Sequence, residues 1–477
     1  MAFTNQLKNQ HLLWRAAFGP MAENINELGH VSQKELYDLL LKTSSHKPVL
    51  INVAGNSVDG FVKGIQEIGK MEKPTREQRK QMRKQSASDL KNLNLNWLSE
   101  MINSEAQLRE KMGLFWHGHF ACRVINIYYQ QELLQSVREN ALGNFGDLLR
   151  VVSKSPSMLS FLNNQQNKKQ HPNENFAREV MELFTMGRGN YTEDDIKEGA
   201  RAFTGWGYKA NGEFVDRKIF HDTGQKTFLG KKGNFNGDDI IDIILEQKAT
   251  AKFITQKIYK YFVNELVDED KVDLLAKSFY QSNYDLQKLM AAIFTSDWFY
   301  DEKNIGNKIK SPVELIVGIR RLIPMELEKP EAQLLFEKVL GQVLFYPPNV
   351  AGWAGGKSWI DSSALLLRMR LPQILTNAEE FAIKPKDDDD VMMGRQGVEE
   401  KVQKRQLSVN VDWNRVVKIF EKIPKDQLMK KLSEVVLQTG NTIPSTILNR
   451  YIDNKSREGF IKTTLIQLMS TPEYQLC

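Results

Sequence analysis

The sequence Phe115-Trp-His-Gly-His-Phe-Ala121 places two of the chain's seven histidines one residue apart within an apolar segment. A neutral imidazole in such surroundings is a good metal ligand, whereas a protonated imidazole is costly to bury. On an ideal helix, residues two apart point about 200° away from each other. His117 and His119 therefore share one metal ion only if Gly118 breaks the helix and the segment is extended.

The alternative for this segment is structural. Both histidines would be buried, neutral and bonded to backbone or carboxylate groups, and Trp116 and Phe120 would belong to the core. Cys122 follows the pair as a soft metal ligand or, more simply, as a small buried residue. Since Cys477 is the other of the two cysteines, the chain has no disulfide framework and no CxxC metal site.

A second segment, Asn173-Glu-Asn-Phe-Ala-Arg-Glu-Val-Met-Glu182, is rich in carboxylates. Glu174, Arg178 and Glu182 follow one another at helical spacing among apolar neighbours, which predicts a well-buried helix from about Asn175 to Met186. Buried carboxylates need an arginine, a histidine or a metal as partner. We expect functional roles for Glu174 and Glu182 and a pairing role for Arg178. The alternative is a set of surface salt bridges.

A third group of polar residues lies further along the chain. His221 and Asp222 follow a predicted strand and suit either metal binding or an ordinary turn. Arg201 is expected to form an ion pair with Glu182 or to bind an anionic substrate. Histidines with carboxylates are ligands of zinc, manganese or iron. The predicted metal ligands are His117, His119, Glu182, His221 and Asp222, and the predicted catalytic residues are Glu174, Arg178, Glu179 and Arg201.

The glycine-rich segment Gly352-Trp-Ala-Gly-Gly-Lys-Ser-Trp359 contains no nucleotide-binding motif, because its spacing differs from a Walker A motif and no strand precedes it. The adjacent prolines Pro347 and Pro348 exclude a helix just before it. Its two tryptophans either pack in a rigid corner or form an aromatic platform for a sugar ring.

The composition is typical of a globular protein, with 41% hydrophobic and 26% charged residues. The net charge of +6 is small for 477 residues, and the clearest basic cluster, Arg76 to Lys84, is typical of a solvated helix face rather than a nucleic-acid site. No window approaches the ~18 apolar residues of a membrane span. The N-terminus lacks the apolar core of a signal peptide, which predicts a cytoplasmic location.

Helical spacing dominates the sequence, so we predict a mainly α, multi-helix fold with one small β-hairpin near residues 208–230. The length exceeds the ~250–300 residues of a single core. Residues Thr192 and Asp195 form a capping box at the start of one helix. The predicted regions are an N-terminal helical region (1–103), a core helical domain (104–380), an acidic flexible linker (381–408) and a C-terminal helical region (409–477).

Six long segments stand out: FWHGHFAC (115–122), NENFAREVMELFTMG (173–187), YTEDDIKEGARAFTGW (191–206), HDTGQKTFLG (221–230), KSPVELIVG (310–318) and PPNVAGWAGGKSWIDSSALLLR (347–368). They resemble motifs of one bacterial family, Domain of Unknown Function 1800, and occur in the family's order. The resemblance extends from about Leu12 to the terminal Tyr474-Gln-Leu-Cys.

The resemblance implies little about chemistry and transfers no catalytic residue. Members are often exported, which implies a periplasmic or exported location as the alternative to the cytoplasm. Their genes often lie beside those of a sulfatase-like family, which implies a sulfatase-like partner protein.

Three hypotheses follow. The first is metal-dependent hydrolysis or oxidation of an envelope-associated polymer or glycan. The second is a non-enzymatic helical scaffold that binds the sulfatase-like partner. The third is a metal-free glycosidase that uses a carboxylate pair, which requires two carboxyl groups no more than about 10 Å apart.

Overall fold

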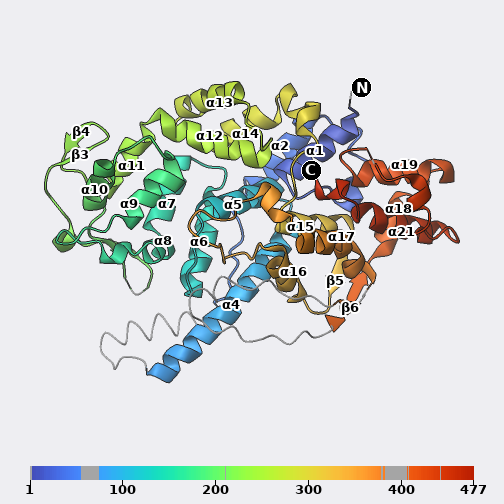
Figure 1. Cartoon of the computed structure of the whole chain (residues 1–477), viewed down its shortest axis with the longest axis horizontal. Helices are drawn as coiled ribbons and strands as arrows, with labels where there is room; N and C mark the ends of the chain where they lie inside the picture. Colours follow the sequence, from blue (N-terminus) through green and yellow to red (C-terminus); the bar gives the residue numbers. More distant parts are fainter. Residues whose placement is uncertain are drawn as a thin grey trace.

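The described part of the chain is mainly α-helical (Figure 1), which confirms the predicted fold class. The predicted 381–408 linker lies almost wholly outside the described residues. Within the described residues, no helix combines the length and the apolar character that a bilayer crossing requires. The computed structural model describes residues 3–54, 75–209, 211–377, 380–381, 405–406, 408–440 and 442–477.

The helices contribute to two main cores and a smaller third one. The larger core is built from residues between Leu12 and Tyr300, and the second combines Trp14 and Ile25 with residues 315–477. The third core contains the buried apolar residues of the helix Arg76–Asn103, packed with Val313 and Val317. The first group of helices is α1 (Asn5–Ala16), α2 (Gln33–Ser44), α4 (Arg76–Asn103), α5 (Gln107–His119), α6 (Ile127–Asn140), α7 (Phe145–Lys154), α8 (Pro156–Phe161), α9 (Asn175–Glu179), α10 (Glu193–Ala202), α11 (Gly237–Leu245), α12 (Lys248–Phe262), α13 (Glu269–Gln281) and α14 (Leu286–Phe294). The second group is α15 (Pro312–Leu322), α16 (Ala332–Leu340), α17 (Ser362–Asn377), α18 (Trp413–Ile419), α19 (Lys425–Val436), α20 (Ser445–Leu448) and α21 (Arg457–Met469).

The β structure is more divided than the single predicted hairpin. The predicted stretch forms two short antiparallel hairpins, because left-handed turns at Gly212 and Gly230 each reverse the chain. Two further ribbons join segments far apart in the sequence. The pairs are β1 (Trp206–Tyr208) with β2 (Phe214–Asp216), β3 (Lys226–Phe228) with β4 (Lys231–Gly233), β5 (Met325–Leu327) with β8 (Val409–Val411), and β6 (Glu380–Phe381) with β7 (Arg405–Gln406).

A buried ion pair fixes α5 between α4 and α6. Glu110 on α5 accepts hydrogen bonds of 2.9 Å from Nε1 of Trp97 on α4 and from Nε of Arg138 on α6. All three side chains are buried. Because removal of one partner would leave a buried charge without compensation, this cluster holds the helix that carries both histidines in a fixed position.

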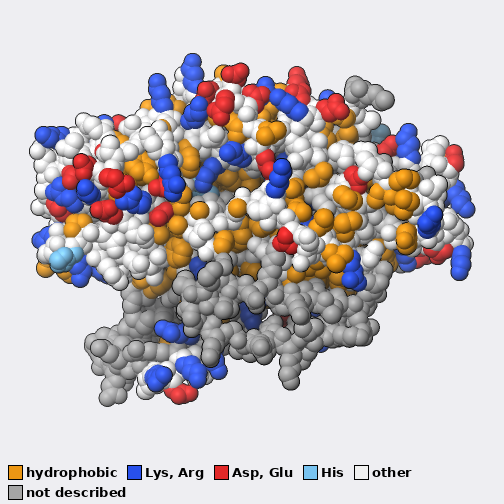
Figure 2. All heavy atoms as spheres, in the orientation of Figure 1, with side chains coloured by type: hydrophobic (Ala, Val, Ile, Leu, Met, Phe, Trp, Pro, Cys, Tyr) orange, Lys and Arg blue, Asp and Glu red, His pale blue; other side chains and the backbone are white. Residues whose placement is uncertain are grey.

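The basic cluster from Arg76 to Lys84 lies on the N-terminal half of α4, which extends beyond the other helices in Figure 1. Arg76, Lys80, Arg83 and Lys84 are exposed, and Figure 2 shows blue Lys and Arg side chains at this end. The predicted solvated helix face is confirmed for these side chains.

The pH dependence of stability has a specific source on α16. Glu337 is buried and accepts hydrogen bonds from Nδ2 of Asn94 (2.7 Å) and from the backbone N–H of Leu344 (3.1 Å). Burial raises the pKa of Glu337 from 4.5 to about 8, although these hydrogen bonds oppose the change. A carboxyl whose folded pKa is raised stabilises the fold at low pH, and this stabilisation is lost as pH rises through about 8.

We therefore expect Glu337→Gln to gain stability relative to the wild type as pH rises from about 5 to about 8, because its amide has no proton to lose. Urea denaturation at both pH values measures the difference. Glu331→Gln, at an exposed position nearby, is the control. If the difference in the free energy of unfolding between Glu337→Gln and the wild type is the same at both pH values, the raised pKa of Glu337 is contradicted.

A candidate active-site cleft around His119

Helix α5 continues through Gly118 to His119, so the segment is not extended. The two histidines consequently point in different directions, as expected for residues two apart on a helix. The condition for a metal ion shared by His117 and His119 is not met in this structure.

His117 is a core histidine. Its Nε2 accepts a hydrogen bond of 3.1 Å from the backbone N–H of Phe345, and its ring lies edge-on to the rings of Trp97 and Phe345. Burial lowers the pKa of His117 to about 3, which keeps the ring neutral. The lone pair that a metal would need is therefore already used.

His119 faces the helix that carries the second motif. Its Nε2 lies 3.0 Å from the carbonyl oxygen of Phe184. Because a carbonyl oxygen only accepts, Nε2 carries the hydrogen and the lone pair is on Nδ1. That lone pair lies 3.4 Å from Nζ of Lys257 on α12. Burial lowers the pKa of His119 well below its usual value, and the neighbouring Lys257 lowers it further.

A π-helix supplies the carbonyl groups for this contact. The predicted α-helix from Asn175 to Met186 is α only in its first half, α9, and continues as the π-helix η3 (Val180–Thr185). The wide turn is accompanied by a 2.6 Å hydrogen bond from Oγ1 of Thr185 to the carbonyl of Val180. In η3 the carbonyl of Leu183 accepts from Lys257 (3.3 Å) and that of Phe184 from His119. Such π-turns occur frequently at functional sites.

Lys257 is a partly buried cation whose hydrogen-bond contacts are with His119 and Leu183, and its Nζ also lies 5.0 Å from the centre of the Phe253 ring. Burial and the neighbouring Lys260 lower the pKa of Lys257 to about 8. An ammonium group has three N–H donors, and these two contacts use two of them. The third remains for a ligand.

This Lys257–His119 pair lines a cleft of about 640 Å³, which we call the His119 cleft. α5 and α12 belong to the larger core and α15 to the second, so the cleft lies between the two cores. Gly118 faces it, since a Cβ at that position would have no atom within 4 Å. Its lining includes the aromatic residues Phe115, Tyr261, Trp353 and Trp359, the lysines Lys257, Lys260, Lys308 and Lys357, and the carboxylates Glu265 and Glu314.

Glu314, at the start of α15, is buried in an ion cluster beside the cleft. It accepts hydrogen bonds from Lys111, from Lys308 (3.0 Å) and from the backbone N–H of Ser311 (2.7 Å). Burial acts to raise the pKa of Glu314, but the two ammonium groups hold it well below its usual range. Glu314 therefore stays ionised and neutralises Lys308 within the cleft lining.

The glycine-rich loop closes one side of the cleft through a close contact. Gly352 has a φ of +78°, and a Cβ there would lie 2.3 Å from the carbonyl oxygen of Gly118. Since no side chain fits this approach, the loop packs directly on the backbone of α5.

We expect Gly352→Ala to destabilise the fold by more than the ~1–3 kcal/mol of a strained left-handed residue, because the new methyl group also collides with α5. Gly341→Ala is the matched control, with a φ of +87° but open space around its Cβ. Thermal denaturation of both variants measures the difference. Equal losses in the two variants would show that the contact with Gly118 is not tight.

The predicted carboxylates of the second motif lie in separate ion pairs. Glu182 accepts hydrogen bonds from Arg188 (2.5 Å) and from Oη of Tyr191 (2.8 Å), and Arg178 joins Glu174 to Glu193. Burial acts to raise the pKa of Glu182, but these two hydrogen bonds lower it overall. Glu174 pairs with Arg178 and Glu182 with Arg188, so the two carboxylates have different partners, and a carboxylate pair of Glu174 and Glu182 stays a prediction.

The remaining predicted site residues form a third, independent group. Arg201 donates to Asp222 (2.8 and 3.2 Å) and to Glu198, instead of to Glu182. His221 lies with Nδ1 3.0 Å from the carbonyl of Thr204, whose hydroxyl accepts from the backbone N–H of Asp222. Glu179 is half-buried near Glu182, and burial raises its pKa.

Metal binding stays a prediction. Among the residues that the structure describes, no three His, Cys, Asp or Glu side chains lie close enough together to hold a metal ion. The five predicted ligands belong to the separate groups described above, and burial strongly raises the pKa of the Cys122 thiol, which keeps it protonated. This arrangement does not fit an ion shared by these ligands.

Comparison with known proteins gives one match. Residues 11–476 match the family described as "Protein of unknown function (DUF1800)". The chain belongs to the DUF1800 family. No curated protein and no solved structure matches it significantly.

Three of the six segments that resemble the DUF1800 family line the His119 cleft, and a fourth contacts its Lys257–His119 pair through the carbonyls of Leu183 and Phe184. The lining segments contribute Phe115, Gly118 and His119, then Ser311 and Glu314, and finally Ala351 with residues 353–359. This convergence makes the cleft the candidate active site.

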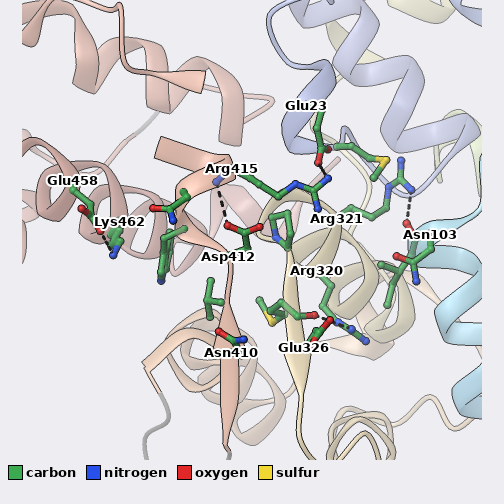
Figure 3. A pocket seen from close by; sticks show the side chains of 17 residues that line it. Glu23, Asn103, Arg320, Arg321, Glu326, Asn410, Asp412, Arg415, Glu458 and Lys462 are labelled. Carbon is green, nitrogen blue, oxygen red and sulfur yellow. Dashed lines mark hydrogen bonds and ion pairs between the residues drawn. The ribbon is translucent and has the colours of Figure 1, made fainter. Parts of the chain in front are cut away.

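A second cavity, of about 620 Å³, lies outside these family segments (Figure 3). Its charges balance, because the lining cations Arg320, Arg321, Arg415 and Lys462 are matched in number by Glu23, Glu326, Asp412 and Glu458. Arg415 pairs with Glu23, and Lys462 pairs with Glu458. We interpret it as a polar junction between the β5–β8 ribbon and the surrounding helices.

Sequence reasoning missed Lys257, although a signal was present. Ile254, Lys257, Ile258 and Tyr261 are spaced i, i+3, i+4, i+7, which places a lysine in the apolar stripe of α12. A cation in such a stripe is desolvated, and that is the property which lowers its pKa.

Proposed function

We propose that this DUF1800 protein is an enzyme that cleaves a glycan in the His119 cleft. The observation that carries the proposal is the combination, in one cleft, of aromatic rings with the hydrogen-bonded Lys257–His119 pair. The partly exposed ring of Trp353 supplies a flat apolar face for a sugar ring, and a few polar groups fix the orientation of the ligand.

Lys257 is the proposed general acid for hydrolysis. With a pKa of about 8 it carries a proton at neutral pH and releases it readily, because a catalytic pKa near the working pH is the most effective. Water attacks the anomeric carbon, the glycosidic C–O bond breaks, and the leaving oxygen takes the Lys257 proton. Glu265, the lining carboxylate outside the Glu314 cluster, takes the proton of the water.

His119 is the proposed positioning residue for this acid. Its tautomer is fixed by the Phe184 carbonyl, so its Nδ1 lone pair holds one N–H of Lys257 and leaves another for the substrate. Hydrolysis of this kind needs no step through a metal. Elemental analysis of untagged protein measures metal content directly, and about one bound equivalent would favour the metal-dependent form.

A matched pair of substitutions tests the location of the site. Alanine and leucine are both good helix formers, so Gly118→Ala and Gly118→Leu should both preserve α5. Only leucine fills the space in front of Gly118. We expect release of reducing ends from a panel of neutral and acidic polysaccharides to persist in Gly118→Ala and to be lost in Gly118→Leu.

The control is the melting temperature of both variants, which should not fall below that of the wild type. Equal activity of the leucine variant and the wild type would place the site elsewhere. Absence of any cleavage across the panel by the wild type would reject a glycan-cleaving enzyme.

A further inference from the structure

Positively charged side chains outnumber negatively charged ones in the lining of the His119 cleft. Four lysines and two carboxylates line it. Glu314 is occupied by Lys111 and Lys308 at its buried end. This leaves Lys257, Lys260 and Lys357 against a single remaining carboxylate, Glu265.

The lysines of α12 differ in whether a carboxylate neutralises them, and this shows where the excess of positive charge lies. On the described part of α12, Lys252 pairs with Glu269 and Asp273, whereas no ion pair joins Lys257 or Lys260 to a described carboxylate. Lys257 and Lys260 are spaced i, i+3, so they lie on one face and repel each other. Lys257 is partly buried and Lys260 is exposed, and a partly desolvated cation beside a like charge is unfavourable unless an anion compensates it.

The glycine-rich loop adds a third lysine, Lys357, to those of α12 in the cleft lining. Glu265 lies against the backbone of the glycine-rich loop, since a Cβ at Gly356 would lie 2.6 Å from its Oε1. The next residue, Lys357, is exposed at the rim of the same cleft. Cations on α12 and on the loop therefore line the cleft together with Trp353 and Trp359.

We infer that the His119 cleft takes an acidic glycan, whose carboxylate or sulfate groups supply the counter-charges for Lys257, Lys260 and Lys357. This inference rests on the proposed function and adds the substrate class to it. The shared chemistry is a sugar chain with regularly spaced anions, and the aromatic rings of the cleft face its sugar rings while the ammonium groups face its charges.

The test measures the affinity of the full chain for matched oligosaccharides. The change in tryptophan fluorescence on binding is the readout. The probes are an oligogalacturonate, an oligosaccharide of chondroitin sulfate, a neutral xylo-oligosaccharide of equal length and a short poly-glutamate. We expect at least one acidic oligosaccharide to bind about tenfold more tightly than the neutral one. We also expect this preference to shrink as salt rises from about 50 to about 300 mM.

The variants separate the proposed cations from general basicity. Lys260→Gln and Lys357→Gln should each weaken acidic binding about 3- to 10-fold while leaving neutral binding nearly unchanged. Lys252→Gln, on the same helix as Lys260 but outside the cleft, should not change the affinity for the acidic oligosaccharides. A stronger response to the carboxylated or to the sulfated probe identifies which anion the cleft prefers.

Several outcomes would overturn the inference. These are equal affinity for acidic and neutral chains, unchanged acidic binding in the Lys260→Gln Lys357→Gln double variant, or binding of poly-glutamate as tightly as the acidic glycans. Cleavage of a neutral glycan that does not depend on these lysines would overturn the inference and keep the proposed function. If no glycan is bound and none is cleaved, both the inference and the proposed function are contradicted.

Discussion

Glu314→Gln is expected to destabilise the protein by about 3–5 kcal/mol, because it leaves Lys111 and Lys308 buried without their counter-charge. The Glu314 side chain is fully buried and also caps α15 through the backbone N–H of Ser311. Urea denaturation at neutral pH measures the loss. The folded pKa of Glu314 is lowered, so its stabilisation is present above its ordinary pKa of 4.5 and is lost as pH falls below that value.

Two controls accompany this prediction. Asp38→Asn removes an exposed ion pair with Lys34 and should change stability little. Adding Lys111→Met to Glu314→Gln should restore part of the loss, since it removes one of the uncompensated cations. A Glu314→Gln variant within about 1 kcal/mol of the wild type would show that the cluster contributes little.

Lys257→Met is expected to lower kcat by about 10²–10⁴-fold on the glycan that the wild type cleaves, the usual contribution of a general acid. The same substitution should keep or raise the melting temperature, because it removes a partly buried cation that has no carboxylate partner among the described residues. In the wild type, kcat should decline as pH rises through about 8, where Lys257 loses its proton.

The pH profile separates catalysis from packing. The groups that face Lys257 are His119 on α5, Lys260 on its own helix, the Leu183 carbonyl of η3 and the ring of Phe253. Lys252→Met on the same helix should leave both kcat and the profile unchanged. A Lys257→Met variant that keeps its activity, or an alkaline decline that persists without Lys257, would remove this residue from the mechanism.

Local patterns in the sequence predicted much of the fold correctly. The capping box of Thr192 and Asp195 opens α10 as expected, and Gly187 adopts a left-handed conformation just after the predicted helix end. The segment with Pro347 and Pro348 is not helical. These features depend on residues close together in the chain, so spacing and turn chemistry determine them.

The candidate site depended on contacts that sequence spacing does not contain. The geometry of a helix showed that His117 and His119 diverge unless Gly118 breaks the helix, and the helix is continuous. Which of the two faces a cleft is decided by α12 and by η3, which lie far along the chain. The carbonyls of Leu183 and Phe184 in the π-turn make contacts with distant helices, and a periodicity of 3.6 residues predicts neither the turn nor these contacts.

The scaffold hypothesis rested on two charged regions, the basic face of α4 and the acidic segment, and the structure describes only the first of them well. Arg76, Lys80, Arg83 and Lys84 are exposed on α4, whereas most of the acidic segment lies outside the described residues. The sulfatase-like partner therefore stays a prediction from the family resemblance. Deletion of residues 387–406, followed by co-purification, measures its contribution.

The most direct test of the account is a crystal structure of the protein with a bound oligogalacturonate. The account predicts a sugar ring against Trp353 and a carboxylate within about 3 Å of the ammonium group of Lys257, Lys260 or Lys357. An oligosaccharide ordered in the second cavity, which Arg320 and Arg321 line, with the His119 cleft containing only water, would contradict it.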